Sequence, residues 1–257
     1  MSDSTQRFSS RVENYVKYRP GYPDAVIELL REECGLTPRA MVADIGSGTG
    51  ISSRLFLRNG NAVFGVEPNA KMRAAGEEFL REFPNFHSMD GKADATGLPE
   101  ASIDLIVAAQ AFHWFDPVAT RGEWERILKP NGYAVLLWNA RRETTTPFLA
   151  AYDELLVRYA TDYSSINHKR IDDKAAGAFF APCPFGFRSI DSEQVFDYEG
   201  LEGRLLSSSY TPEETDPRYA PLLQGLREIF DVYQEDGRVS FEYDTTVYWG
   251  RLSSNEN

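Results

Sequence analysis

Three glycines beside a carboxylate mark the first stretch of this chain whose residue types could do chemistry. In "VADIGSGTGISS", Asp44 ends a short apolar run, and Gly46, Gly48 and Gly50 follow at every second position. A glycine loop between a strand and a helix lets the backbone approach a ligand closely at the carboxyl edge of a parallel sheet. The stretch therefore predicts a ligand-binding turn.

The glycine spacing argues against a nicotinamide dinucleotide as that ligand. The dinucleotide fingerprint has glycine at its first, third and sixth positions. Counted from Gly46, the sixth position is Ile51, and Gly50 occupies the fifth. Asp44 would also repel a nearby pyrophosphate, whereas a cationic ligand would be attracted. The loop therefore favours a ligand without phosphates.

Two more acids stand after the next apolar runs. Glu67 ends "AVFGVE", a position where a carboxylate can accept hydrogen bonds from both hydroxyls of a ribose. Asp94 in "KADATGLP" follows a third predicted strand and could accept from an exocyclic amine. One such acid alone is more often a solvated surface carboxylate. Three of them in register with the glycines favour one binding site.

Alternating strands and helices must position these residues. Apolar runs predict strands over 41–45, 62–67, 85–94, 102–109 and 133–138, with helices over 22–35, 51–60, 69–82 and 120–128. This alternation predicts an α/β, doubly wound fold with a mostly parallel sheet covered on both faces. After Trp138 the pattern predicts helices over 146–160, 169–180 and 221–234, and strands over 187–198 and 238–252.

The absence of a Pro/Gly/Ser linker predicts a single domain over 1–257. Within it we expect an N-terminal segment and helix (1–35), a ligand-binding core (36–140) and a substrate-side elaboration with the last strands (141–257). A separate C-terminal domain is the alternative.

Composition narrows the classes of partner. The 257 residues carry a net charge of -12, which argues against nucleic acid and anionic membranes, because both recruit clustered Lys and Arg. Two cysteines, Cys34 and Cys183, do not make a disulfide framework. The polar start "MSDSTQRFSS" lacks the apolar core of a signal peptide, and no apolar run approaches a membrane span, so we expect a cytoplasmic protein.

At this point the sequence resembles the class I S-adenosylmethionine-dependent methyltransferases. The matching motifs are "DIGSGTG", "GVEPNAKM", "ADATGLPEASIDLIVAAQAFHW" and "ILKPNGYAVLLW", within residues 41–138. The fit is nearest to the type-11 small-molecule branch that includes trans-aconitate methyltransferases. That branch also tends to carry a stretch like "YVKYRPGYP". The resemblance therefore favours an N-terminal lid within residues 1–35, with Tyr18 and Arg19 facing the cofactor, and the alternative is an exposed arm that docks on the sheet. The resemblance implies a seven-stranded Rossmann-like sheet with an antiparallel last strand, and S-adenosyl-L-methionine as cofactor.

The resemblance also implies roles for single residues. Asp44 would hold the amino group of the cofactor, Glu67 its ribose hydroxyls, and Asp94 with Ala95 its adenine edge. Gln110 would lie near the sulfonium. The full set of residues expected to bind the cofactor is Tyr18, Arg19, Asp44, Gly46, Ser47, Gly48, Gly50, Glu67, Met72, Asp94, Ala95 and Gln110.

The catalytic and acceptor side is less determined by the sequence. His113 in "AQAFHWFD" is the candidate general base, and a structural or substrate-shaping histidine is an equal alternative. Trp114 and Trp138 are expected at the acceptor, with Arg141 and Tyr210. His87 and His168 show no metal-ligand spacing with His113, so no metal is expected.

Arginines of the C-terminal half leave two readings open. Arg141, Arg142 and Arg204 could form a local carboxylate-binding site. The favoured interpretation is that these arginines lie on the surface and pair with Glu143 or Glu202.

We therefore predict a methyltransferase that acts on a small molecule, with oxygen as the acceptor atom. The alternatives are a methyltransferase for protein or nucleic acid, a nicotinamide oxidoreductase, and a cofactor-binding module without turnover. The acceptor, the oligomeric state and the pathway do not follow from the sequence.

Overall fold

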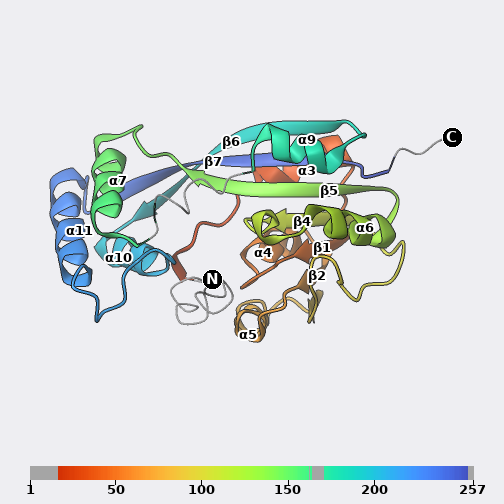
Figure 1. Ribbon diagram of the computed structural model, residues 1–257, viewed down its shortest axis with the longest axis horizontal. Helices are drawn as coiled ribbons and strands as arrows, with labels where there is room; N and C mark the ends of the chain where they lie inside the picture. Colours follow the sequence, from red (N-terminus) through yellow and green to blue (C-terminus); the bar gives the residue numbers. More distant parts are fainter. Residues whose placement is uncertain (1–16, 162, 164–170, 254–257) are drawn as a thin grey trace. The chain divides into compact units, whose positions relative to one another are not determined.

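The computed structural model describes residues 17–161, 163 and 171–253 (Figure 1). The expected lid lies partly in residues 1–16, and His168 lies in 164–170, so both fall outside the described residues. In chain order the elements are α3 (Ala25–Cys34), β1 (Met41–Ile45), α4 (Ile51–Arg58), β2 (Ala62–Val66), α5 (Ala70–Phe79), β3 (Phe86–Met89), β4 (Ile103–Ala109), η1 (Phe112–Trp114), α6 (Pro117–Ile127), β5 (Leu128–Arg141), α7 (Pro147–Tyr159), α9 (Asp173–Phe180), β6 (Phe185–Phe196), α10 (Tyr198–Leu206), α11 (Tyr219–Tyr233) and β7 (Val239–Gly250).

The strands form one seven-stranded sheet in the order β3-β2-β1-β4-β5-β7-β6. Strands β1 to β5 pair in parallel, and the last strands run antiparallel. The order reverses at β1, since β2 and β3 lie on one side of it and β4 on the other. In a doubly wound sheet this reversal opens a crevice at the carboxyl ends of the strands. The predicted fold class is confirmed.

The chain divides into two compact units. The sheet unit comprises residues 21–139, 171–190 and 245–257, and the helical unit comprises 1–20, 140–170 and 191–244. The expected cofactor-binding core, 36–140, lies in the sheet unit except for its last residue. The expectation of a single domain over 1–257 stays a prediction.

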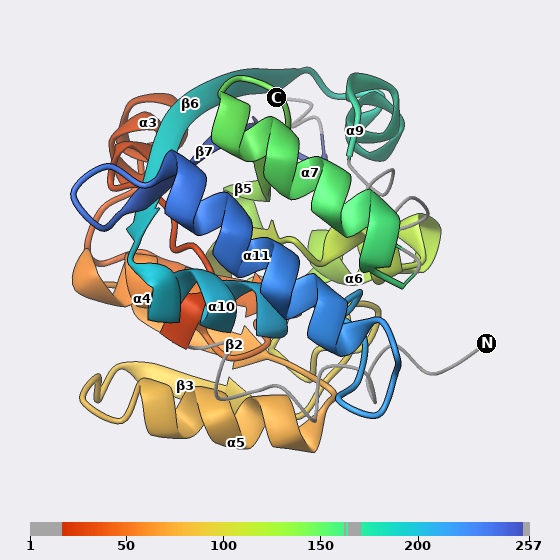
Figure 2. The same ribbon diagram turned by 90° about the vertical axis from the view of Figure 1, so that its left-hand side faces the viewer.

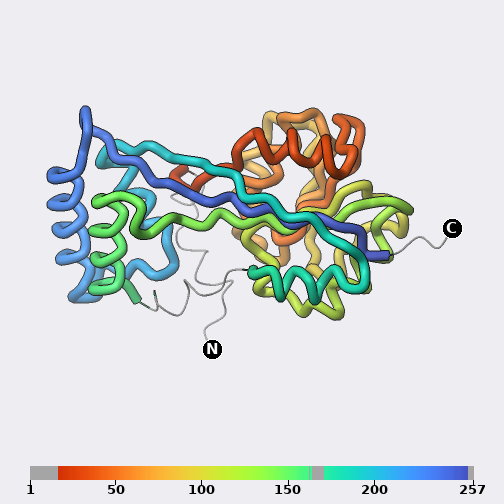
Figure 3. The backbone as a smooth tube through the Cα atoms, turned by 90° about the horizontal axis from the view of Figure 1, so that it is seen from above, coloured from red at the N-terminus to blue at the C-terminus, as the bar shows by residue number. Residues whose placement is uncertain are grey.

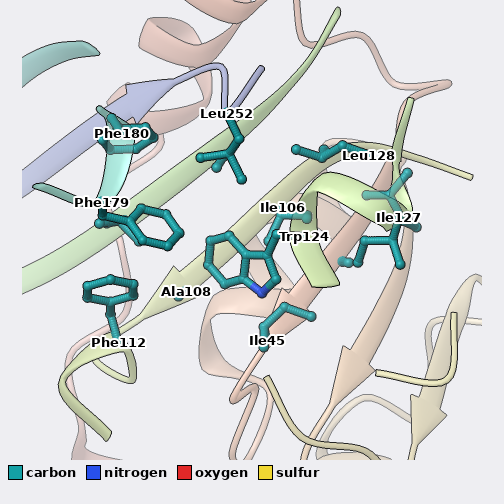
Figure 4. Packing of buried hydrophobic residues seen from close by; sticks show 14 of the residues in the cluster. Ile45, Ile106, Ala108, Phe112, Trp124, Ile127, Leu128, Phe179, Phe180 and Leu252 are labelled. Carbon is teal, nitrogen blue, oxygen red and sulfur yellow. The ribbon is translucent and has the colours of Figure 1, made fainter. Parts of the chain in front are cut away.

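Two buried clusters hold the sheet unit together, one on each face of its sheet. Because side chains alternate along a strand, Ala43 packs into one cluster and Val42 into the other. On the first face, α6 and α9 cover the strands, and Trp124 of α6 is fully buried there (Figure 4). Its ring packs edge-on against Phe179, with the centroids 5.4 Å apart. Helices α3 and α4 supply the second cluster.

The helical unit is built around α7, α10 and α11. Helices α7 and α11 run side by side (Figures 2 and 3). They bury an apolar cluster that includes Leu156, Leu222, Leu226 and Phe241, all at zero exposure. Among the residues that the structure describes, no helix has the length and apolar character that a membrane span requires.

Local signals explain most boundaries. Asn69 caps α5 by accepting hydrogen bonds from the backbone N–H groups of Lys71 and Met72. Asp116 caps α6 in the same manner, and Pro117 follows at its first turn. Asn131 in "KPNG" has φ 71°, in the left-handed region that asparagine tolerates better than most residues with a side chain.

Three expectations for the elements need correction. β5 is longer than expected, because it begins directly after α6 at Leu128 and continues through Arg141. The third strand is shorter, Phe86–Met89, and the chain then forms a turn closed by the pair Lys92 and Ala95. Helix α10 was not expected: its sequence, "YEGLEGRLL", contains two glycines, which lower helix propensity.

Candidate functional site

The glycine loop joins β1 to α4 at the carboxyl edge of the sheet. Gly46, Gly48 and Gly50 have φ of 71°, 57° and 82°, in the left-handed region that favours glycine. Space adds to this requirement, since a Cβ on Gly46 would lie 2.6 Å from the Cβ of Ala111. The N–H groups of Gly46 and Ser47 donate to the carbonyl of Val66, at 2.8 and 3.2 Å. The loop is therefore tied to the end of β2.

Asp44 is the buried carboxylate at the end of β1. Its Oδ2 accepts hydrogen bonds from the hydroxyls of Ser52 and Ser53, at 2.7 and 2.6 Å. Its Oδ1 is buried and has no hydrogen-bond partner among the described residues. Burial raises the pKa of Asp44 to about 6, with a further contribution from Glu67, while the two serines oppose the shift. A cationic group beside Oδ1 would donate a hydrogen bond to it, and its positive charge would stabilise the ionised carboxylate of Asp44.

Glu67 follows β2 and joins two loops. Its Oε2 accepts from the backbone N–H of Gly48 at 3.0 Å, and its Oε1 accepts from that of Asn69 at 2.8 Å. The side chain is only 9% exposed, and burial raises the pKa of Glu67 although both backbone donors oppose this. Each carboxylate oxygen can accept more than one hydrogen bond, so capacity remains for ligand hydroxyls. Glu67 therefore holds the glycine loop and can also face a ligand.

Gln110 follows β4 with a strained backbone. Its φ is 57°, which is uncommon for a residue with a side chain. Residues with such strained backbone are found more often at functional sites than elsewhere. Its Nε2 donates to the carbonyl of Asn139 at 2.8 Å, and the Asn139 side chain in turn accepts from Thr245 Oγ1 at 2.7 Å. This chain of contacts fixes the amide, and its carbonyl oxygen stays able to accept.

Three aromatic rings lie together at this edge: those of His113 and Trp114, which follow β4, and that of Trp138 in β5. The ring of His113 is 4.3 Å from that of Trp114 and 5.1 Å from that of Trp138, measured between centroids. Trp114 is 49% exposed, unusual for a tryptophan. Exposed aromatic faces beside an imidazole can shield a ligand from water and attract a cation.

Asp94 and Ala95 are both exposed and lie in the turn after β3. The N–H of Ala95 donates to the carbonyl of Lys92 at 3.1 Å, so in this structure it already has a partner. The carboxylate of Asp94 faces solvent, and its role at an adenine edge stays a prediction.

The expected site residues fall into two groups. In the sheet unit, the structure joins the glycine loop with Asp44 and Glu67, and Met72 approaches the loop, since its Cε would lie 3.5 Å from a Cβ on Gly48. The remaining residues of this unit lie after β3 (Asp94 and Ala95), after β4 (Gln110, His113 and Trp114) and within β5 (Trp138). The residues expected at the site that belong to the helical unit are Tyr18, Arg19, Arg141 and Tyr210.

The helical-unit residues have partners within their own unit. The hydroxyl of Tyr18 donates to Glu199 at 3.2 Å, and Arg19 donates to the carbonyl of Ser207 at 3.2 Å. Arg141 donates to Asp153 at 2.8 Å. Their roles toward cofactor and acceptor, like those of the other site residues, stay predictions.

Ser52 and Ser53 are functional candidates that sequence reasoning missed. They open α4 directly after the loop, and a pair of hydroxyls there was the available signal. The preferred reading of surface arginines paired with Glu143 or Glu202 is wrong for Arg204, which is buried. Arg142 instead pairs with Asp191 and Asp244.

No cluster of three or more His, Cys, Asp or Glu side chains with metal-binding placement occurs within residues 17–161, 163 and 171–253.

Comparison with known proteins agrees with the geometry of the sheet unit. Residues 43–136 match the family described as "Methyltransferase domain". An uncharacterised methyltransferase-like protein of Schizosaccharomyces pombe is 31% identical over 248 residues, which cover 94% of this chain and 93% of the relative. A malonyl-acyl-carrier-protein O-methyltransferase of a Marinomonas species is 28% identical over 136 residues, covering 51% of this chain and 49% of the relative.

A solved structure resembles the fold. It comes from Anaeromyxobacter dehalogenans, is described as a proposed type II methyltransferase, and matches with a TM-score of 0.66 at 23% identity. The match covers 91% of this chain and 98% of the other. At this identity the likeness shows the fold alone.

Proposed function

Because the chain belongs to the class I S-adenosylmethionine-dependent methyltransferases, we propose that it transfers a methyl group to an oxygen atom of a small-molecule acceptor. We further propose that it belongs to the type-11 small-molecule branch that includes trans-aconitate methyltransferases. The observation that carries the assignment of the cofactor site is the arrangement of Asp44, the glycine loop and Glu67 at one sheet edge.

The residues of this edge fit the cofactor. The buried Oδ1 of Asp44 has no hydrogen-bond partner in the described part of the chain, and an amino group would supply one. Glu67 would accept the ribose hydroxyls while it keeps its bonds to Gly48 and Asn69. The loop contributes backbone at Gly46 and Gly48, where the absence of a side chain permits close approach. When bound, S-adenosylmethionine supplies a methyl group on a positively charged sulfur.

The remaining residues position the acceptor and exclude water. Alignment of the acceptor with the methyl group can lower the activation barrier by on the order of 7–11 kcal/mol, so few dedicated catalytic groups are needed. His113 would accept a proton if the acceptor is a hydroxyl. A carboxylate is already ionised near neutral pH and needs no base, and His113 would then shape the site. Trp114 and Trp138 would form the wall of that site.

One observation opposes nucleic acid as the acceptor, and a second favours oxygen as the reactive atom. The net charge of -12 opposes binding of nucleic acid. One relative is named as an O-methyltransferase, and its name concerns a malonyl group carried on a protein.

The test is a transfer assay with S-adenosylmethionine that carries a tritium-labelled methyl group. The acceptors are a panel of carboxylic acids, a panel of phenols and alcohols, bulk tRNA and a mixture of denatured proteins. We expect label in one of the first two panels, and Glu67→Ala as the control should lower it strongly when S-adenosylmethionine is kept below its saturating concentration. Release of the label as methanol in base identifies a carboxylate ester, and base-stable label excludes one; mass spectrometry of the product then separates an ether from a methyl group on carbon.

Other outcomes would contradict the proposal. Label in tRNA or protein, with none in small molecules, would favour the macromolecular alternative. Binding of S-adenosylhomocysteine without transfer to any acceptor would favour a cofactor-binding module without turnover.

A further inference from the structure

Among the described residues, no carboxylate forms an ion pair with one buried guanidinium of the helical unit. Arg204 of α10 is 6% exposed. Its Nη1 donates to the hydroxyl of Ser208 at 3.0 Å, and its Nε approaches the hydroxyl of Tyr243 at 3.5 Å. Both partners are neutral, and among the described residues no ion pair joins Arg204 to an acid. Burying such a charge is costly unless a negative group accompanies it.

Two more arginines gather at the same place. Arg19 donates to the hydroxyl of Ser208 at 3.5 Å, so it shares this partner with Arg204. Arg141 donates to Asp153 at 2.8 Å and to the hydroxyl of Tyr163 at 2.6 Å. Tyr210 lies within the field of all three guanidinium groups, which lower its pKa although burial opposes this. Asp153 thus supplies one negative charge to the cluster, on the side of Arg141.

The hydroxyl of Tyr152 is a further donor, without a partner among residues 17–161, 163 and 171–253. Tyr152 is 1% exposed, and its hydroxyl makes no hydrogen bond within the described part of the chain. The Arg141 guanidinium carbon lies 5.1 Å from its ring centroid, and Phe241 packs edge-on against the ring at 4.9 Å. The ring is therefore fixed by packing, and a buried polar atom is left unsatisfied. Such an atom is costly in a folded protein unless a ligand or water completes it.

We propose that Arg204, Arg141 and Arg19, together with the hydroxyl of Tyr152, bind the oxyanion group of a small ligand. Guanidinium groups are donors only, so the missing component is an acceptor with negative charge. Carboxylate and phosphate both match the planar fork of arginine, and they are the shared chemistry of this site. Arg19 and Tyr210 are only partly buried, so the cluster reaches solvent. Binding here does not depend on methyl transfer.

The test is calorimetric titration of the full chain with citrate, malonate, inorganic phosphate and sulfate. The variants are Arg204→Met, which removes the buried charge at similar volume, and Tyr152→Phe, which removes only the hydroxyl. Arg142→Met is the matched control, because Arg142 lies in the same unit and its charge is paired with Asp191 and Asp244.

We expect the wild-type chain to bind at least one of these anions. Arg204→Met should weaken that binding about tenfold to a hundredfold, and Tyr152→Phe about twofold to tenfold, as expected for charged and neutral hydrogen bonds. Arg142→Met should stay within about twofold of wild type. Preference for citrate or malonate identifies a carboxylate ligand, and preference for phosphate or sulfate identifies a phosphate ester or free phosphate.

Thermal unfolding without added anion separates a binding role from a structural one. If Arg204 is an uncompensated charge, Arg204→Met unfolds at the same temperature as wild type or above it. Tyr152→Phe should not lower the temperature either, because it removes a hydroxyl that makes no hydrogen bond to any described residue. The proposal is overturned if the wild-type chain binds none of the four anions, or if both variants bind them as wild type does.

A parallel titration with S-adenosylhomocysteine keeps this proposal distinct from the proposed function. Wild-type affinity for it in every variant, with loss of anion binding, supports an anion site separate from the cofactor site. Anion binding in a chain that transfers no methyl group would leave this site standing and remove the proposed function. Methyl transfer to an uncharged acceptor, in a chain that binds none of the anions, would support the proposed function and overturn the anion site.

Discussion

Asp44 should make cofactor binding depend on pH in the range where few carboxylates titrate. Its pKa is about 6 in the free protein because the side chain is fully buried. A positively charged amino group at Oδ1 favours the ionised form, so the protein must lose this proton when the cofactor binds. The variant Asp44→Asn removes the titration and keeps the size of the side chain.

The expected magnitude follows from the fraction of Asp44 that is ionised. With a pKa of about 6, about nine tenths of the protein is ionised near pH 7 and about one tenth near pH 5. The apparent dissociation constant is the intrinsic one divided by that fraction. Affinity for S-adenosylhomocysteine should therefore fall about tenfold between these pH values, which corresponds to about 1.4 kcal/mol.

Calorimetry at both pH values, in two buffers of different ionisation enthalpy, measures the affinity and the protons released. Asp44→Asn should bind more weakly near pH 7 and show little further loss near pH 5. Asp104→Asn is the control, because Asp104 lies near the start of β4, at the opposite edge of the sheet. Equal pH dependence in wild type and Asp44→Asn would refute the reasoning, and so would uptake of a proton on binding.

The same shift has a consequence for the stability of the free protein. Because the folded pKa of Asp44 is above its ordinary value, the folded state binds more protons than the unfolded state between about pH 4 and 6. Stability of the free protein should therefore fall as the pH rises through this window, by about 3 kcal/mol at most from this group. Chemical denaturation of wild type and Asp44→Asn across the window isolates the contribution.

Three further substitutions in the sheet unit test its other parts. Glu67→Ala should weaken binding of S-adenosylmethionine about tenfold to a hundredfold, because it removes the acceptor for the ribose hydroxyls and the carboxylate that anchors the loop. Unchanged affinity in calorimetry would contradict the ribose assignment. His113→Ala should lower turnover of a hydroxyl acceptor about a hundredfold or more at unchanged cofactor affinity, and a loss below about tenfold in steady-state rates would favour a carboxylate acceptor. Asn69→Ala should destabilise the fold by about 1 kcal/mol, because it removes the cap of α5, and an unaltered denaturation midpoint would show that the cap contributes nothing.

Periodicity, capping signals and glycine spacing in the sequence were enough to predict the fold of the sheet unit and to propose most residues of its candidate site. The alternation of apolar runs and helical patterns predicted the parallel strands, and Asn69 marked where α5 begins, since capping depends on contacts a few residues apart. The cap at Asp116 was missed, and α6 begins three residues before the predicted start. The loop with Gly46, Gly48 and Gly50 and the acids Asp44 and Glu67 could be placed together because parallel strands end at one edge.

Longer-range contacts were beyond such rules. The chain of contacts from Gln110 through Asn139 to Thr245 depends on which side chains meet after folding. The serines that bind Asp44 follow it by only eight and nine residues, and the sequence held a signal for them. Helix α10 was missed because its glycines weaken the local signal and packing of Leu201 and Leu205 overrides it.

The sequence by itself determined the fold class, the cofactor loop and the family, because these rest on periodicity and spacing along the chain. Only the tertiary structure decided the environment of Arg204. Its neighbours in the sequence are ordinary for a surface helix, yet the helical unit buries it among Tyr152, Tyr243 and Ser208. Burial and charge balance are sums over residues far apart in the chain, and no local pattern contains them.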